Sequence, residues 1–211
     1  KTISNNTKLS MKEKEIIEGF CSVIELLPNI NYEQTNERFA DLDIIDKKIP
    51  KNSEFVHDVA YWYCDKNLIE IDNWNAIYHE LGHVLSGGNN GSFFEEGIPS
   101  LLSWELQGYR SYPEYIIITQ MFREMFGSDF MIKSFLSSDN LLKEKIGSIV
   151  DPEFANAFFT ALDDYHEKYR NRKTHDDQVR TQRALNLIIN YIEIIYSCYT
   201  NVELDYNNLS R

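Results

Sequence analysis

The residues with the clearest capacity for chemistry are His79, Glu80 and His83, which stand in the order His-Glu-Leu-Gly-His. Side chains four positions apart lie on the same face of an α-helix, so the two imidazoles can bind a single metal ion. Glu80 lies at the edge of that face, where its carboxylate can reach a water molecule near the metal without being a ligand itself. The pattern therefore indicates a metal site that carries its own general base.

A catalytic zinc ion typically has three protein ligands, so one more residue is needed beside the two histidines. Glu96 lies on the next expected helix, after a glycine-containing segment, 87–91, that can turn this helix back alongside the first. Its neighbour Glu95 is the rival for this place; if Glu96 is the ligand, we expect Glu95 to lie next to the ligands without binding the metal itself. We expect one zinc ion per chain here.

The elements that must position these residues follow from hydrophobic spacing and turn residues. Segment 55–64 is rich in β-branched and aromatic side chains, 65–67 has the composition of a turn, and 68–71 alternates again, which predicts a β-hairpin. Segment 72–87 begins with two capping residues and ends at a glycine pair, so it predicts the helix that carries the histidines. A second helix is expected over about 92–107.

Later helices are marked by capping residues. Ser111 and Glu114 have the spacing of a Ser-x-x-Glu capping box, which predicts the start of a helix that ends near Phe126. Asp151 precedes a proline and is expected to cap a helix that runs to roughly Tyr169.

The chain as a whole predicts an α+β fold in two parts. Residues 1–108 form a small N-terminal α/β lobe with the β-hairpin or edge strand and the helix of the histidines. Residues 109–211 form a mostly helical C-terminal lobe, and the two lobes make one compact catalytic domain. The histidine-bearing helix joins them, so we expect the substrate in a cleft between the lobes.

Charge and hydropathy exclude two classes of partner. With 33 acidic and 21 basic side chains, and a net charge of −12, the chain lacks the basic surface that nucleic acids attract. Its apolar runs are short, so no membrane span is expected. Because the sequence begins with Lys1 rather than methionine, we expect an exported bacterial protein, secreted or at the cell surface, with a cytoplasmic location as the alternative.

The segment Phe94-Glu95-Glu96-Gly97-Ile98-Pro99-Ser100 resembles the Glu-Gly-x-Ala segment of gluzincin peptidases, the thermolysin-like, aminopeptidase and lethal-factor relatives. The resemblance covers about residues 69–104. It implies a zincin-like fold in which His79, His83 and Glu96 bind zinc and Glu80 is the base. It also implies that strand 68–71 is a sheet edge along which an extended peptide pairs.

Two residues depart from the gluzincin pattern. Pro99 stands where many relatives have a small residue, and Ser100 replaces the acid expected about one turn after the third ligand. Ser100 can still orient a ligating imidazole, but more weakly than an acid would.

The expected activity is hydrolysis of peptide bonds in a peptide or protein substrate. Zinc and Glu80 activate a water molecule that attacks the carbonyl group, and Glu80 carries the proton to the leaving amine. The oxyanion also needs a donor, which in gluzincins is a Tyr or His from later in the chain; Tyr165 and His166 are the candidates. Rivals nearer in the sequence are Tyr109, Tyr112 and Tyr115.

Two other interpretations stay open. Small intracellular peptidases that cleave phage-type repressors also show His-Glu-Leu-Gly-His after a strand, but usually with Glu-x-x-Ala-x-x-Phe-Ala on the next helix, which Glu96-Gly97-Ile98-Pro99 does not fit. The other is a zinc-binding module without turnover. Glu80 argues against the module, because a structural site has no use for a base and usually has a fourth protein ligand.

Overall fold

The computed structural model describes residues 3–24, 37–48, 60–87, 93–137 and 140–209, with side-chain environments up to Asn201. The chain forms two compact units, Lys1–Ser138 and Asp139–Arg211. The expected lobe boundary at Gly108 falls inside the first of these units. The fold is mostly helical with one small sheet, so the predicted α+β class is confirmed.

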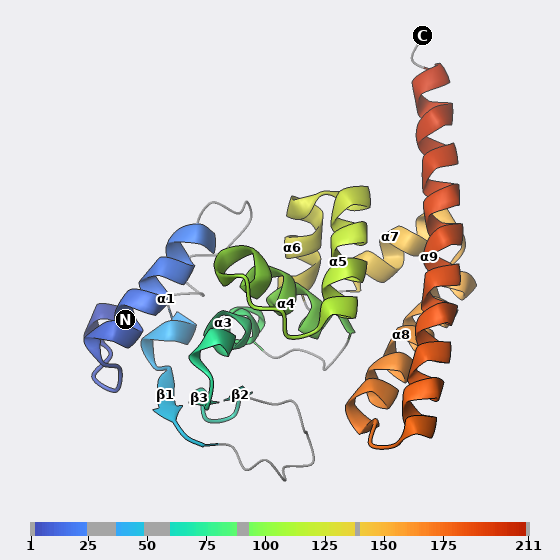
Figure 1. Cartoon of the computed structure of the whole chain (residues 1–211). Coiled ribbons are helices and arrows are strands. Elements are labelled where there is room, and N and C mark those ends of the chain that lie inside the picture. Colours follow the sequence, from blue (N-terminus) through green and yellow to red (C-terminus); the bar gives the residue numbers. More distant parts are fainter. Residues whose placement is uncertain (1–2, 25–36, 49–59, 88–92, 138–139, 210–211) are drawn as a thin grey trace. The chain divides into compact units, whose positions relative to one another are not determined.

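The first unit holds the sheet and the helices that carry His79, Glu80, His83 and Glu96 (Figure 1). Its strands are β1 (Asp43–Asp46), β2 (Ala60–Tyr63) and β3 (Leu68–Ile71). Its helices are α1 (Met11–Ile24), α3 (Ile77–Ser86), α4 (Phe93–Gln107), α5 (Pro113–Phe126) and α6 (Ser128–Leu136), with single 3-10 turns at η1 (Ile3–Asn5) and η2 (Trp74–Ala76).

The sheet has the strand order β1-β3-β2. β2 and β3 pair antiparallel, with Trp62 opposite Ile69, so the predicted hairpin is confirmed over the described residues; its expected beginning, 55–59, lies outside them. β1 pairs parallel to the other side of β3, with Ile44 opposite Ile69. β3 is therefore the central strand, and the prediction that it is an edge open to a peptide is wrong, because both of its sides already pair with strands.

α3 ends where its residues predict, but it begins later than expected, at Ile77, with Ala76 at its N-cap and no side-chain cap. Asn73 accepts a hydrogen bond from the Asn75 backbone N–H and so caps the turn η2, which leads directly into α3. Gly87 ends the helix in the left-handed conformation, at φ 81°, where glycine has no steric penalty. Leu81, Val84 and Leu85 are buried, which fixes the orientation of the helix against the rest of the unit.

The packing of α3 against α4 depends on a glycine–proline contact. A Cβ atom at Gly82 would lie 2.8 Å from the Cβ and 3.0 Å from the Cα of Pro99, so only glycine allows the two helices to approach so closely. Pro99, which departs from the gluzincin pattern, is thus the residue that fills the space left by Gly82. On the other side of α4, a Cβ at Gly97 would overlap the hydroxyl of Thr119 on α5.

The capping box predicted for α5 is wrong. The residue at the N-cap position is Tyr112, and no side chain caps the helix. Pro113 at the first helical position has no backbone N–H to satisfy, which removes part of the need for a cap. The Ser111 hydroxyl hydrogen-bonds to other residues instead, and Glu114 Oε2 is buried without a hydrogen-bond partner.

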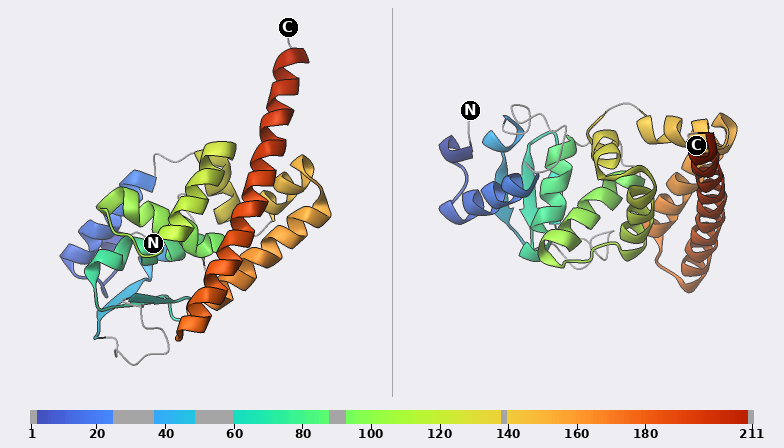
Figure 2. Two further views of the ribbon diagram at one scale, coloured as in Figure 1. Left: turned by 45° about the vertical axis from the view of Figure 1, so that its right-hand side comes forward. Right: turned by 90° about the horizontal axis from the view of Figure 1, so that it is seen from above.

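The second unit consists of α7 (Leu141–Ile149), α8 (Pro152–Asn171) and α9 (His175–Leu209). Asp151 accepts a hydrogen bond from the Phe154 backbone N–H at 2.8 Å, so the predicted cap of α8 is confirmed. α8 and α9 lie side by side (Figures 1 and 2). Their buried residues include Phe158 and Leu162 from α8 and Ile188, Ile192 and Ile195 from α9.

None of the helices in the described part of the chain combines the length and the apolar character that crossing a membrane requires.

The close contact of α3 and α4 predicts the effect of Gly82→Ala. The added methyl group overlaps Pro99, so we expect the free energy of unfolding to fall by about 1–3 kcal/mol, the usual cost of overpacking. Gly19→Ala is the matched control, because the nearest atom to a Cβ there is Tyr78 Oη at 3.9 Å and alanine is the better helix former. Urea unfolding of both variants measures this; a Gly82→Ala variant as stable as Gly19→Ala would contradict the contact.

Candidate metal centre

The three predicted ligands come together at one point in the first unit. His79 and His83 lie one turn apart on α3, and Glu96 lies in the first turn of α4, which packs against α3. The Nε2 atoms of the two histidines are 3.1 Å apart. Glu96 Oε2 lies 3.2 Å from Nε2 of His79 and 3.6 Å from Nε2 of His83.

These separations fit a tetrahedral zinc site. Ligand atoms at about 2.0–2.1 Å from a tetrahedral zinc ion lie about 3.3 Å from one another, and the three observed separations scatter around that value. His79, His83 and Glu96 could therefore hold a metal ion. Within the described ranges no fourth His, Cys, Asp or Glu belongs to the group, so these residues offer three candidate ligands, one fewer than a structural zinc site usually has.

The electrostatics of the group favour a cation among the three ligand atoms. Burial by itself lowers the pKa of His83, but the charge and hydrogen bond of Glu96, with the charges of Glu80 and Glu95, raise it from 6.5 to about 9. Burial raises the pKa of Glu96, but the charge of His83 and hydrogen bonds to both histidines hold that pKa well below its usual value. The site thus attracts positive charge, which a proton or a metal ion can supply.

Glu80 and Glu95 lie close to this group without belonging to it. Glu80 is in the first turn of α3 with only 6% of its surface exposed, and its charge contributes to the raised pKa values of both His83 and Tyr109. Glu95 also raises the pKa of His83 through its charge, but its carboxylate is not one of the clustered ligand atoms. Of the two neighbouring glutamates, Glu96 is the one whose carboxylate lies among the candidate ligand atoms.

The side of His79 that faces away from Glu96 contacts two serines and a tyrosine. Nδ1 of His79 lies 3.2 Å from the hydroxyl of Ser100, the residue expected to orient a ligand, and 3.3 Å from that of Ser111. The Tyr112 ring centroid is 5.6 Å from that of His79. The contribution of Ser111 is not evident from the sequence, because its spacing to Glu114 matches a capping box.

The tyrosines nearest to the motif in the sequence have different environments. Tyr109 is half-buried, and its pKa is raised by burial and by the charge of Glu80. Tyr115 is buried and stacks on Phe93 with a centroid separation of 4.1 Å, so it is a packing residue of the core. Tyr109 therefore shares the surroundings of the expected general base.

Tyr165 and His166, the expected oxyanion donors, belong to the second unit. Both are buried on α8, and the Tyr165 ring lies 5.7 Å from that of Tyr169, centroid to centroid. Their role beside a metal ion stays a prediction.

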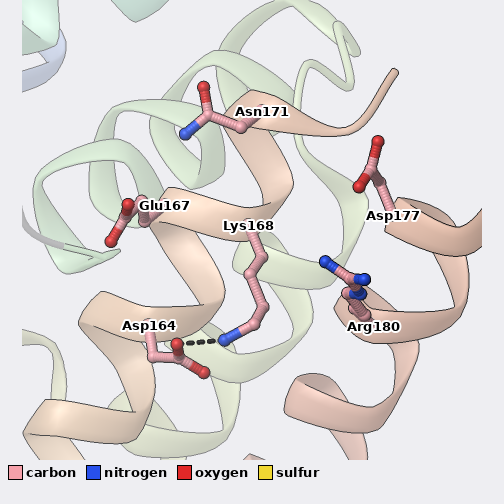
Figure 3. Close-up of a pocket in the computed structure, with 6 residues that line it drawn as sticks. All are labelled: Asp164, Glu167, Lys168, Asn171, Asp177 and Arg180. Atoms are coloured by element: carbon pink, nitrogen blue, oxygen red, sulfur yellow. Dashed lines mark hydrogen bonds and ion pairs between the residues drawn. The ribbon is translucent and has the colours of Figure 1, made fainter. Parts of the chain in front are cut away.

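The second unit also has a hollow of about 250 Å³ where α8 and α9 meet (Figure 3). Its lining residues are Asp164, Glu167, Lys168, Asn171, Asp177 and Arg180. Lys168 forms an ion pair with Asp164, and Asp177 accepts hydrogen bonds from the backbone and side chain of Thr174 at the start of α9. Neither Tyr165 nor His166 lines this hollow, so it does not extend the site predicted from the sequence.

No protein-family model, curated protein or solved structure matches the chain. The function must therefore be inferred from the residues and geometry of the site itself.

The two neighbouring glutamates give a direct test of the ligand set. Glu96→Gln removes the only negative charge among the three candidate ligands, because histidine binds a metal as the neutral imidazole. We therefore expect zinc affinity to fall by more than about 100-fold, beyond the usual loss when a hydrogen-bond partner of a ligand is removed. Glu95→Gln changes the same charge one residue away and should stay within a few-fold of wild type. Competition with a chromophoric chelator measures both affinities, and equal losses in the two variants would contradict the assignment.

Proposed function

We propose that this chain is a zinc-dependent peptidase of the gluzincin type, with one zinc ion bound by His79, His83 and Glu96. The observation that supports this most strongly is the set of ligand separations, between 3.1 and 3.6 Å, formed by two helices in the order that gluzincins use. The zincin-like character of the fold is part of the same proposal. It is supported by the pairing of the histidine helix with a glutamate helix beside a small sheet.

The chemistry follows from the positions of the side chains. When bound, zinc supplies Lewis acidity that lowers the pKa of a water molecule and polarises a carbonyl group. Glu80, next to a ligand in sequence and outside the ligand set, takes the proton from the attacking water and returns it to the leaving amine. Its low exposure keeps bulk water away from this transfer and strengthens its electrostatic influence on the site.

Peptide hydrolysis explains two features that a zinc-binding module without turnover does not. A purely structural zinc site is completed by a fourth protein ligand, whereas the described residues supply three. The second feature is Glu80 itself, a buried acid that lies beside the candidate ligand atoms without being one of them. A general base requires such a position.

Glu80→Gln separates catalysis from metal binding. The amide cannot accept the proton, so we expect kcat/KM on a peptide library to fall by about 10²–10⁴-fold while zinc stays at one per chain. Glu95→Gln is the matched control and should keep both activity and metal. Undiminished cleavage by Glu80→Gln would overturn the role of the base. Wild-type protein that binds zinc but cleaves no member of the library would instead indicate the module.

Tyr109 is the donor that we propose for the developing oxyanion. It is half-buried and lies within the electrostatic influence of Glu80, and its phenol can donate a hydrogen bond. Tyr109→Phe should lower kcat by about 10²–10³-fold with little change in KM, because the bond forms only as negative charge develops. Tyr112→Phe keeps its ring and should behave as wild type. If Tyr165→Phe or His166→Ala lowers kcat and Tyr109→Phe does not, the donor lies on α8.

A further inference from the structure

Ser111 has a place in the site that its sequence context does not suggest. Its hydroxyl lies 3.0 Å from that of Ser100 and 3.3 Å from Nδ1 of His79, and Ser100 lies 3.2 Å from the same nitrogen. The two hydroxyl oxygens and Nδ1 form a triangle on the side of the His79 ring away from Glu96. Its members come from three different segments, namely α3, α4 and the connection between α4 and α5.

The orientation of Ser111 costs the protein a helix cap. A serine at this spacing from Glu114 normally caps the following helix, and the loss of such a cap destabilises a helix. Here α5 begins without any side-chain cap, and Glu114 Oε2 is buried without a hydrogen-bond partner. The Ser111 hydroxyl, which could cap α5, is hydrogen-bonded to Ser100 and His79 instead. This indicates that these two hydrogen bonds stabilise the structure more than a cap on α5 would.

The proton requirements of His79 explain the need for two hydroxyls. When Nε2 binds a metal, the ring proton is on Nδ1 and must be donated to an acceptor. Ser100 can accept it, but Ser100 is fully buried, so its own O–H also needs an acceptor. Ser111 Oγ lies within reach of that O–H and of Nδ1, so the pair satisfies donors that one hydroxyl would leave unpaired.

We infer that Ser111 is a positioning residue, which acts with Ser100 to fix the orientation and the tautomer of His79 as a metal ligand. The inference rests on the proposed function, because it assigns His79 to a metal. The two hydroxyls take the place of the single acid found in the gluzincin pattern. The connection that carries Ser111 also carries Tyr112, whose ring lies against His79, so this connection contacts the ligand in two ways.

The test compares two substitutions of nearly the same shape. Ser111→Thr keeps the hydroxyl and Ser111→Val removes it, so packing changes are shared and the hydrogen bond is not. We expect the valine variant to bind zinc about tenfold more weakly than the threonine variant. This is the lower end of the usual loss when a residue that hydrogen-bonds to a metal ligand is replaced. Its cobalt-substituted form should show shifted visible absorption bands, which report ligand geometry and not activity. Ser103→Ala removes another fully buried hydroxyl of α4 and should change neither measurement.

A double variant tests whether the serines act as a unit. If they do, Ser100→Ala combined with Ser111→Val weakens zinc binding by less than the product of the two single effects. Equal zinc affinities and identical cobalt spectra for the threonine and valine variants overturn the inference, as do fully multiplicative effects in the double variant. Wild-type protein that binds no zinc overturns the proposed function instead, so the two failures are distinguishable.

Discussion

The candidate site depends on how closely α3 and α4 approach each other. Gly82 lies between His79 and His83, directly before the second of them, and Pro99 lies three residues after Glu96, so their contact is beside the candidate ligands on both helices. Any side chain at position 82 would separate the helices and move Glu96 away from the histidines. Gly97 has the same effect on the other side, where it lets α4 lie directly against Thr119 of α5. Two positions without side chains thus let α4 lie close to a helix on each of two sides, and Gly82 is the one that keeps Glu96 near the two imidazoles.

The charges around the ligands explain why this arrangement suits a metal. Three glutamates, at positions 80, 95 and 96, all raise the pKa of His83, so acids surround the imidazoles. Such a concentration of negative charge at a partly buried place is unfavourable by itself. A divalent cation compensates this negative charge better than a single proton does. The cation can also bind the Nε2 atoms of His79 and His83 at the same time. The acidic residues therefore favour a cation at this place.

The features that could be predicted from the sequence are those determined by neighbours along the chain. The four-residue spacing of His79 and His83, the turn between β2 and β3, and the cap at Asp151 each depend on a few adjacent residues. Glu96 could be placed because only a short connection separates its helix from α3. The parallel pairing of β1 could not, because its partner is distant in sequence and the segment has no turn that specifies it. The central position of β3 follows from that pairing, so it cannot be predicted from local sequence either.

Ser111 shows a different limit of sequence interpretation. Its local pattern satisfies one well-defined structural role, and the tertiary structure uses the same hydroxyl for another. Ser100 on α4 and His79 on α3 compete with the backbone of α5 for the Ser111 hydroxyl. No property of the residues around Ser111 indicates which partner is preferred, because the competing groups belong to other segments.

The short sequence separations within the site have a consequence for how the protein folds. His79 is 17 residues from Glu96 and 32 from Ser111, so the site closes only modest loops of chain. The entropy lost in closing such loops is small, and contacts of this kind form early relative to pairings between distant strands. Ligands and supporting serines can therefore meet before the rest of the chain is in place. A metal ion captured at that stage would act as a template around which α3, α4 and the beginning of α5 are brought into register.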